Sequence, residues 1–251
     1  MKMSGNTMLI TGGGSGIGRK LAEGFHRLGN RVIIAGRRRD ALDEVAAANP
    51  GLAVAELDIA DPADVARVAA ALIRDHPGLN VLVNNAGIMP NEDLTAERVE
   101  TSAAEAAIVT NLLGPIRLTA ALLPHLRRQP DAAVLNVTSG LAFVPLAAAP
   151  TYSATKAALH SYTQSMRFQL QGQVEVIEIP PPYVQTALQG ERQANDPRAM
   201  PLDDYIAQTF AVLQQQPTPQ EISVEQVMFL RRAEAEGRAE QTFQALNRGW
   251  D

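Results

Sequence analysis

The sequence predicts an α/β protein built on a doubly wound parallel sheet, and three observations carry this prediction. Short, continuously apolar runs alternate with longer amphipathic stretches, as expected when helices cover both faces of a parallel sheet. A glycine-rich segment, 11–18, lies between the first apolar run and the first amphipathic stretch, where this fold class binds phosphate groups. Hydrophobic residues make up 46% of the 251, which is ample for one large core.

Six apolar runs are the expected strands, and the amphipathic stretches between them are the expected helices. The strands are expected at 8–11, 31–35, 53–57, 81–84, 133–138 and 174–179. The helices are expected near 16–29, 39–48, 61–75, 97–128 and 152–171. Asp61 followed by Pro62 supplies the start of the third helix, with a cap and a proline at the first helical position.

Beyond residue 179 the pattern becomes proline-rich and polar. Helices are expected near 203–214 and 223–247, separated by a Gln- and Pro-rich stretch. We expect one domain over 1–251, in which 186–251 form a substrate loop and a C-terminal helical extension, because loops on a rigid sheet carry function.

Composition and charge argue against several classes of function. The net charge of −5 and the pI near 5.4 disfavour nucleic acid and an anionic membrane as partners. The absence of cysteine excludes disulfides, thiolate metal ligands and a cysteine nucleophile, and it fits a cytoplasmic location, which we expect. The four histidines have no ligand spacing, so no metal site is expected. We find no secretory signal and no run approaching eighteen apolar residues, so no membrane association is expected.

The glycine-rich segment 11–18 reads T-G-G-G-S-G-I-G. Glycines let the backbone approach a pyrophosphate, and the helix that follows supplies free amides and a favourable dipole. An ATPase phosphate loop has similar glycine spacing, but Arg19 stands where that loop needs lysine and Lys20 where it needs Ser or Thr. The segment therefore predicts dinucleotide binding, with a plain turn as the alternative.

Tyr152 and Lys156 are the most informative pair of side chains in the chain. They are four residues apart on an expected helix and so share one face. Lysine is rare here: only Lys2, Lys20 and Lys156 occur, which indicates that a compact ammonium is needed at this position. A nearby ammonium lowers the pKa of a phenol from about 10 toward neutrality, and such a phenol exchanges a proton with a carbonyl oxygen. The alternative is an ordinary surface pair.

Six ordered motifs over residues 7–186 make the chain resemble the short-chain dehydrogenase/reductase family. They are T-G-G-G-S-G-I-G at 11–18, Asp58-Ile59 after the third strand, N-N-A-G at 84–87, Asn111 in T-N-L-L-G, Ser139 after the fifth strand and Y-S-A-T-K at 152–156. The resemblance implies the Rossmann fold and an oxidoreductase that uses a nicotinamide dinucleotide. Ser139 also precedes Tyr152 by the interval that is usual in this family.

The resemblance also implies a role for each matching residue. Tyr152 would be the general acid/base, and Lys156 would bond the nicotinamide ribose and lower the pKa of Tyr152. Ser139 would hold the substrate oxygen, and Asn111 would position a water that links Lys156 to solvent. For Ser139 or Asn111 taken alone, capping or a core hydrogen bond is the alternative. The implied cofactor contacts are Gly12, Gly14, Ser15, Gly16, Ile17, Gly18, Arg37, Asp58, Ile59, Asn84, Ala86, Gly87, Tyr152, Lys156, Pro182, Val184 and Thr186.

The end of the second expected strand indicates which nicotinamide cofactor is used. Members of the family that use NAD place an acidic residue at the position of Gly36, and Gly36 cannot accept bonds from ribose hydroxyls. Arg37 is instead well placed for a 2′-phosphate, although Ser15 stands where many NADP users have a second basic residue. We expect NADP(H) as the cofactor, with NAD(H) as the alternative. The arginines at 37–39 could instead form the solvated start of a helix without contacting the cofactor.

Two departures from the family pattern stand out. The family segment P-G-x-V-x-T is P-P-Y-V-Q-T at 181–186, and Pro182 in place of glycine should stiffen the loop beside the nicotinamide. The usual glycine-rich final strand is missing, and 221–224 leads into a helix as in a subgroup associated with D-alanine transfer to teichoic acids.

Because the missing strand often helps to build tetramers, we expect a homodimer through the helices at 97–128 and 152–171, with a tetramer as the alternative. The small residues that would pack there are Ala106, Ala107, Ala154, Ala157 and Ala158. Burial of these residues within the subunit is an equally good interpretation.

The leading hypothesis is an NADP(H)-dependent oxidoreductase that interconverts a ketone or aldehyde and the corresponding alcohol. A small to medium apolar substrate is expected. Candidate pocket residues are Leu141, Phe143, Val144, Tyr183 and Leu188. The alternative is a redox-sensing regulator that binds the dinucleotide without turnover, and such a protein would not need Tyr152 and Lys156.

Overall fold

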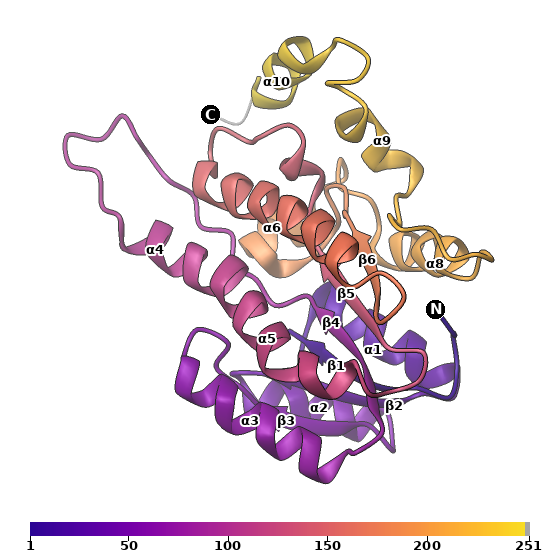
Figure 1. Ribbon diagram of the computed structural model, residues 1–251. Helices are drawn as coiled ribbons and strands as arrows, with labels where there is room; N and C mark the ends of the chain where they lie inside the picture. Colours follow the sequence, from indigo (N-terminus) through magenta and orange to yellow (C-terminus); the bar gives the residue numbers. More distant parts are fainter. Residues whose placement is uncertain (249–251) are drawn as a thin grey trace.

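A computed structural model describes residues 1–248 of the chain, and its centre is a six-stranded parallel sheet with helices on both faces (Figure 1). The strand order is β3-β2-β1-β4-β5-β6. The strands are β1 (Thr7–Thr11), β2 (Arg31–Gly36), β3 (Ala53–Glu56), β4 (Leu79–Asn84), β5 (Ala133–Val137) and β6 (Glu175–Ile179). The predicted doubly wound parallel sheet is therefore confirmed. Its order reverses between β1 and β4, and ligands bind at such a reversal, outside the carboxyl ends of the strands.

Helices follow most strands. They are α1 (Gly16–Arg27), α2 (Arg39–Ala48), α3 (Pro62–Asp75), α4 (Ser102–Ile108), α5 (Gly114–Leu126), α6 (Pro150–Gln169), α7 (Glu191–Ala194), α8 (Leu202–Leu213), α9 (Glu225–Arg231) and α10 (Ala239–Asn247). Helix α3 begins as predicted: the Asp61 side chain accepts a hydrogen bond from the Ala63 amide at 2.8 Å, and Pro62 occupies the first helical position.

Successive residues of each strand pack into two different cores. Met8 and Ile10 of β1 belong to one cluster, which α1, α2 and α8 complete. Leu9, between them, belongs to a second cluster with α3, α5 and α6. All three residues are fully buried. Burial on both faces explains why the strands appear in the sequence as unbroken apolar runs.

The helix expected over 97–128 differs from the prediction in two ways. It starts at Ser102, because residues 97–101 are all exposed and have no apolar face to bury. A π-helical segment, Val109–Leu113, then separates α4 from α5. Such segments are rare inside α-helices and often lie at functional sites.

The C-terminal helix expected over 223–247 is two helices, α9 and α10. Between them Gly237 has a φ of +66°, a left-handed conformation that ends a helix and favours glycine. The segment before α9 does not form a final strand. It makes a single parallel bridge to the sheet edge, between Glu221 and Glu178 of β6.

One described run, Ser102–Leu126, is long and apolar enough to cross a membrane by length and composition alone. It is not an unbroken apolar run, because Thr110, Asn111 and Arg117 lie within it, so it does not contradict the expectation from the sequence. A core helix of an α/β protein passes the same test, and Leu118, Leu122 and Leu126 of this run are fully buried in the second core cluster.

Candidate active site

A cavity of about 600 Å³ opens at the carboxyl ends of the strands, where the strand order reverses. The glycine segment after β1 lies on one side of it, and Ser139, Tyr152 and Lys156 line another part. Segments far apart in the sequence thus share one cavity of the size that small-molecule sites have.

The glycine segment needs glycine for conformation and for space. Gly12 and Gly16 have φ values of +69° and +53°, which side chains other than glycine rarely adopt. A Cβ atom on Gly18 would lie 2.4 Å from the carbonyl oxygen of Gly12. Helix α1 begins at Gly16, so its first amides face the cavity that Gly14, Ser15 and Gly16 line. This cradle of backbone donors at a helix N-terminus fits the pyrophosphate of a dinucleotide.

Two arginines line the cavity at the end of β2. Arg37 was predicted, whereas its neighbour Arg38 was not. Arg38 donates a hydrogen bond to the Ser15 hydroxyl at 3.3 Å, and this contact links the end of β2 to the glycine segment. Arg39 pairs with Asp43 on α2 instead. The run of three arginines was the only sequence signal for Arg38, and it does not say which of them face inward.

The residues predicted after β3 and β4 divide between the cavity and the structure around it. Ile59, Ala86 and Gly87 line the cavity, together with Asn85, which was not predicted. The carboxylate of Asp58 accepts a hydrogen bond from the Ala60 amide at 3.0 Å and shapes the turn that follows β3.

The side chain of Asn84 is buried in the core rather than directed at the cavity. It donates hydrogen bonds to Thr119 at 3.0 Å and to Asn136 at 2.9 Å, and so ties β4 to α5 and β5. A role for the side chains of Asp58 and Asn84 in cofactor binding stays a prediction.

Ser139, Tyr152 and Lys156 lie side by side in the wall of the cavity, and all three are buried. Ser139 follows β5, and its hydroxyl hydrogen-bonds Tyr152 and accepts a bond from the Leu141 amide at 3.1 Å. Lys156 lies one turn after Tyr152 on α6. Its Nζ is 5.6 Å from the centroid of the Tyr152 ring and donates a hydrogen bond to the Val137 carbonyl at 2.9 Å.

Burial controls the charge of both titrating groups. Burial raises the pKa of Tyr152 to about 12, and the hydrogen bond from Ser139 lowers it only in part. Burial also lowers the pKa of Lys156 to about 8. In the protein alone the Lys156 ammonium donates to a backbone carbonyl, and burial is the main influence on the pKa of Tyr152. That Lys156 and the bound nucleotide together lower the pKa of Tyr152 stays a prediction.

Asn111 is fully buried within the π-helical segment. Its Oδ1 accepts a hydrogen bond from the Ile88 amide, and its Nδ2 donates one to the Ile88 carbonyl, both at 2.8 Å. A Cβ atom on Gly87 would lie 3.2 Å from Asn111 Oδ1 and 3.8 Å from Lys156 Nζ. Asn111 and Lys156 therefore approach each other across Gly87, and the role of Asn111 in holding a water stays a prediction.

The loop after β6 closes the cavity beside the catalytic candidates. Pro182, Val184 and Thr186 line the cavity, as predicted from the family segment. Gln193 of α7 was not predicted. It donates hydrogen bonds to the Val184 carbonyl at 2.9 Å and to the Thr186 hydroxyl at 3.2 Å, and so holds this loop in place.

The far end of the cavity is apolar. Of the five predicted pocket residues, Leu141, Tyr183 and Leu188 line it. The other two do not: Val144 is buried in the structure, and the ring of Phe143 packs against His160 at 5.0 Å. Several apolar lining residues were not predicted, among them Ile88, Met89, Leu146, Leu230 and Leu246. The last two come from α9 and α10, and nothing local in the sequence indicates where those helices pack.

Among residues 1–248 no group of three or more His, Asp or Glu side chains is placed to hold a metal ion.

Comparison with known proteins places this geometry in context. The family model described as short chain dehydrogenase matches residues 6–197. The uncharacterized oxidoreductase DltE of Bacillus subtilis is 42% identical over 237 residues, which are 93% of each chain. The uncharacterized oxidoreductase SA2266 of Staphylococcus aureus is 30% identical over 222 residues, 87% of this chain and 94% of that protein.

Solved structures agree with these matches. A short chain dehydrogenase from Burkholderia cenocepacia in complex with NADP superposes with a TM-score of 0.81 and 26% identity, covering 98% of this chain and 99% of that one. A 3-ketoacyl-(acyl-carrier-protein) reductase from Brucella melitensis complexed with NADH gives 0.77 and 28% identity, covering 86% and 93%.

Replacing Lys156 with methionine should change how stability depends on pH. The pKa of Lys156 is about 8 in the folded chain and 10.5 as the ordinary value, so between these values the folded protein holds fewer protons than the unfolded chain. Its stability therefore rises with pH in this window. From pH 8 to pH 10 the free energy of unfolding of the wild type should rise by about 2 kcal/mol relative to Lys156→Met. Urea unfolding at each pH measures this, and two curves that stay parallel would contradict it.

Proposed function

We propose that this chain, which belongs to the short-chain dehydrogenase family, is an NADP(H)-dependent oxidoreductase. It would interconvert a ketone or aldehyde and the corresponding alcohol. The family and the dinucleotide complexes of its structural neighbours make it a dehydrogenase/reductase that uses a nicotinamide dinucleotide and acts on a small molecule. The observation that carries the proposal is the lining of one cavity by Ser139, Tyr152, Lys156 and the glycine segment.

The bound nicotinamide supplies the hydride, and the protein supplies the proton and the position of the substrate. Because its pKa is about 12, Tyr152 keeps its hydroxyl hydrogen at neutral pH and can donate it to a carbonyl oxygen as that oxygen becomes negative. Ser139 offers a second hydroxyl beside it. Lys156 lies one turn further along α6, with its Nζ 5.6 Å from the centroid of the Tyr152 ring, and its positive charge would favour negative charge on the phenol oxygen during the transfer.

The preference for NADP(H) is supported by the end of β2. Gly36 has no carboxylate for the ribose hydroxyls, while Arg37 and Arg38 offer two guanidinium groups at the cavity wall. A guanidinium binds a phosphate through paired, charge-assisted hydrogen bonds, so these residues suit a 2′-phosphate.

An apolar carbonyl compound of small to medium size suits the far end of the cavity. Aliphatic side chains form this end, and hydrophobic lining with a few placed polar groups is typical of small-molecule sites. The lining residues are Ile88, Met89, Leu141, Leu146, Leu188, Leu230 and Leu246.

A redox-sensing regulator is the second candidate, since dinucleotide binding alone would serve it. Burial of Tyr152 and Lys156 beside the cofactor loop favours catalysis, because a buried ammonium lowers stability and a regulator has no use for it. Fluorescence of NADPH separates the two. Tight binding without any oxidation of NADPH by a panel of ketones and aldehydes would favour the regulator.

Tyr152→Phe should lower kcat by about 100- to 10,000-fold, because it removes the proton donor and leaves the ring in place. The Kd for NADPH, measured by fluorescence, should stay within about threefold, since one hydrogen bond at most is lost. Tyr162→Phe is the matched control, because Tyr162 lies on the same helix but outside the cavity. A Tyr152→Phe enzyme that keeps most of its turnover would refute the assignment.

Arg37→Ala should weaken binding of NADPH by about 10- to 100-fold and leave NADH binding nearly unchanged, because only NADPH carries the 2′-phosphate. Arg39→Ala is the control, since Arg39 pairs with Asp43 on the next helix. Isothermal titration of the wild type and of each variant with NADPH and with NADH gives the dissociation constants. An unchanged preference in Arg37→Ala would remove this residue from the cofactor site.

A cytoplasmic location stays a prediction. The assembly that we propose is a homodimer through α4, α5 and α6. Ala106 on α4 and Ala154 and Ala157 on α6 are exposed, which supports close packing of a second copy, whereas Ala107 is buried within the subunit. Phe168 at the end of α6 is 82% exposed.

Ala157→Arg should therefore weaken self-association at least tenfold, because a long charged side chain cannot enter a face of small residues. Sedimentation velocity over a concentration series measures the dimer, and Lys2→Arg, far from these helices in the sequence, serves as the control. A wild-type protein that stays monomeric at all concentrations would rule out the dimer.

A further inference from the structure

Glu178 of β6 is a buried carboxylate that the proposed chemistry does not use. Its exposed fraction is 1%. A carboxylate in such a place is costly unless hydrogen bonds and opposite charge compensate for lost water. The neighbours of Glu178 therefore indicate what keeps it there.

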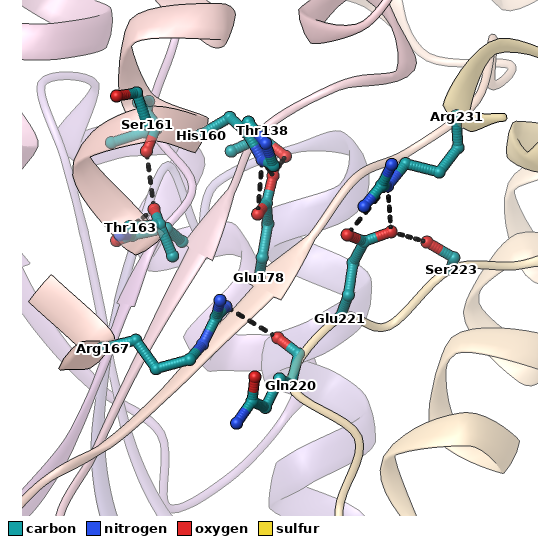
Figure 2. Close-up of polar contacts among 12 residues, drawn as sticks. Thr138, His160, Ser161, Thr163, Arg167, Glu178, Gln220, Glu221, Ser223 and Arg231 are labelled. Carbon is teal, nitrogen blue, oxygen red and sulfur yellow. Dashed lines mark hydrogen bonds and ion pairs between the residues drawn. The ribbon is translucent and has the colours of Figure 1, made fainter. Parts of the chain in front are cut away.

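Two side chains hold the carboxylate. Thr138 donates its hydroxyl hydrogen to Oε1 at 2.7 Å, and His160 Nδ1 lies 2.9 Å from Oε1 and 2.8 Å from Oε2 (Figure 2). Because a carboxylate only accepts, Nδ1 of His160 carries the hydrogen. The ring of Phe143 packs edge-on against the imidazole at 5.0 Å and fixes its orientation.

The backbone of Glu178 is held as firmly as its side chain. Its amide donates to the Gln220 carbonyl at 2.9 Å, and its carbonyl accepts from the Ile222 amide at 2.8 Å. The amide of Thr138 in turn donates to the Ile179 carbonyl at 2.9 Å. The carboxylate is therefore held firmly in place, and it bonds a residue at the end of β5 and a residue of helix α6.

Both partners of Glu178 lie next to catalytic candidates. Thr138 immediately precedes Ser139 and lines the cavity. His160 lies one helical turn after Lys156 and two turns after Tyr152, so the three share one face of α6. The carboxylate therefore connects the segment that carries Ser139 to the helix that carries Tyr152 and Lys156.

We propose that Glu178, together with His160, is a positioning pair for the reductase reaction: it holds Ser139 and the Tyr152–Lys156 helix in register across the cavity. This inference rests on the proposed function. A shift of about 1 Å between catalytic groups can cost on the order of 100-fold in rate. The contacts of Glu178 with Thr138 and His160 should therefore affect turnover far more than the binding of cofactor or substrate.

Glu178→Gln should lower kcat by about 10- to 100-fold, with the Kd for NADPH and the KM for the carbonyl substrate within about threefold of wild type. The matched control is Glu221→Gln. Glu221 pairs with Arg231 at 2.8 Å, next to Glu178 on the same sheet edge, but neither residue belongs to β5 or α6 (Figure 2). A kcat loss no larger than that of Glu221→Gln would overturn the proposal.

Substitutions of His160 separate positioning from general loss of structure. His160→Asn keeps a donor near the place of Nδ1, whereas His160→Leu removes it at similar volume. The proposal expects His160→Asn within about fivefold of the wild-type kcat and His160→Leu about 10- to 100-fold lower, measured at a temperature at which both variants remain folded. Equal kcat values for the two variants would refute it. These variants also decide the matter if Glu178→Gln does not fold.

A measurement that needs no turnover distinguishes failure of this inference from failure of the proposed function. The chain has only three lysines, so ¹³C-labelled lysine gives few NMR signals, and Lys156→Met assigns the signal of Lys156. Glu178→Gln should move this signal and Glu221→Gln should not. An unmoved signal overturns the inference even in an active enzyme, whereas a moved signal without activity toward any carbonyl compound refutes only the reductase.

Discussion

The hydrogen bond between the Lys156 ammonium and the Val137 carbonyl is the interaction on which the site depends. It joins helix α6 to the last residue of β5, where the chain leaves the sheet. Tyr152 lies one turn before Lys156, and Ser139 lies two residues after Val137, so this one contact brings the two hydroxyl groups together. Lys156 and Val137 are both buried, and without competing water a charge-assisted hydrogen bond is strong and well defined.

Burial also decides which proton the site can move. A lysine near a tyrosine favours a phenolate through its charge. In the protein alone, however, Lys156 Nζ donates to the Val137 carbonyl, and burial raises the pKa of Tyr152 to about 12 while it lowers that of Lys156 to about 8. The protein alone therefore presents a neutral phenol. A neutral phenol is a proton donor, which suits reduction of a carbonyl group.

Much of the fold and the inner part of the site could be predicted from the sequence, because both depend on local patterns. The apolar runs locate the strands, and the glycines at 12 and 16 meet a positive φ that few other residues adopt. Leu230 and Leu246 could not be found this way. They reach the cavity only through the packing of α9 and α10, which distant residues determine. The run of arginines at 37–39 drew attention to Arg38, but the direction of its side chain depends on the residue at which β2 ends.

The edge of the sheet at β6 explains why a buried carboxylate is retained there. In place of a full final strand, the segment 220–222 makes only one bridge to β6, so few backbone hydrogen bonds hold this edge. Side chains supply the rest: Arg167 of α6 donates to the Val176 carbonyl at 2.9 Å and to the Gln220 carbonyl at 3.0 Å, and Glu178 binds β5 and α6 from the same strand. An edge held by side chains can be rigid only if each polar group is satisfied. The side chains that hold this edge in place of a full final strand are thus the ones that we propose keep the catalytic groups in position.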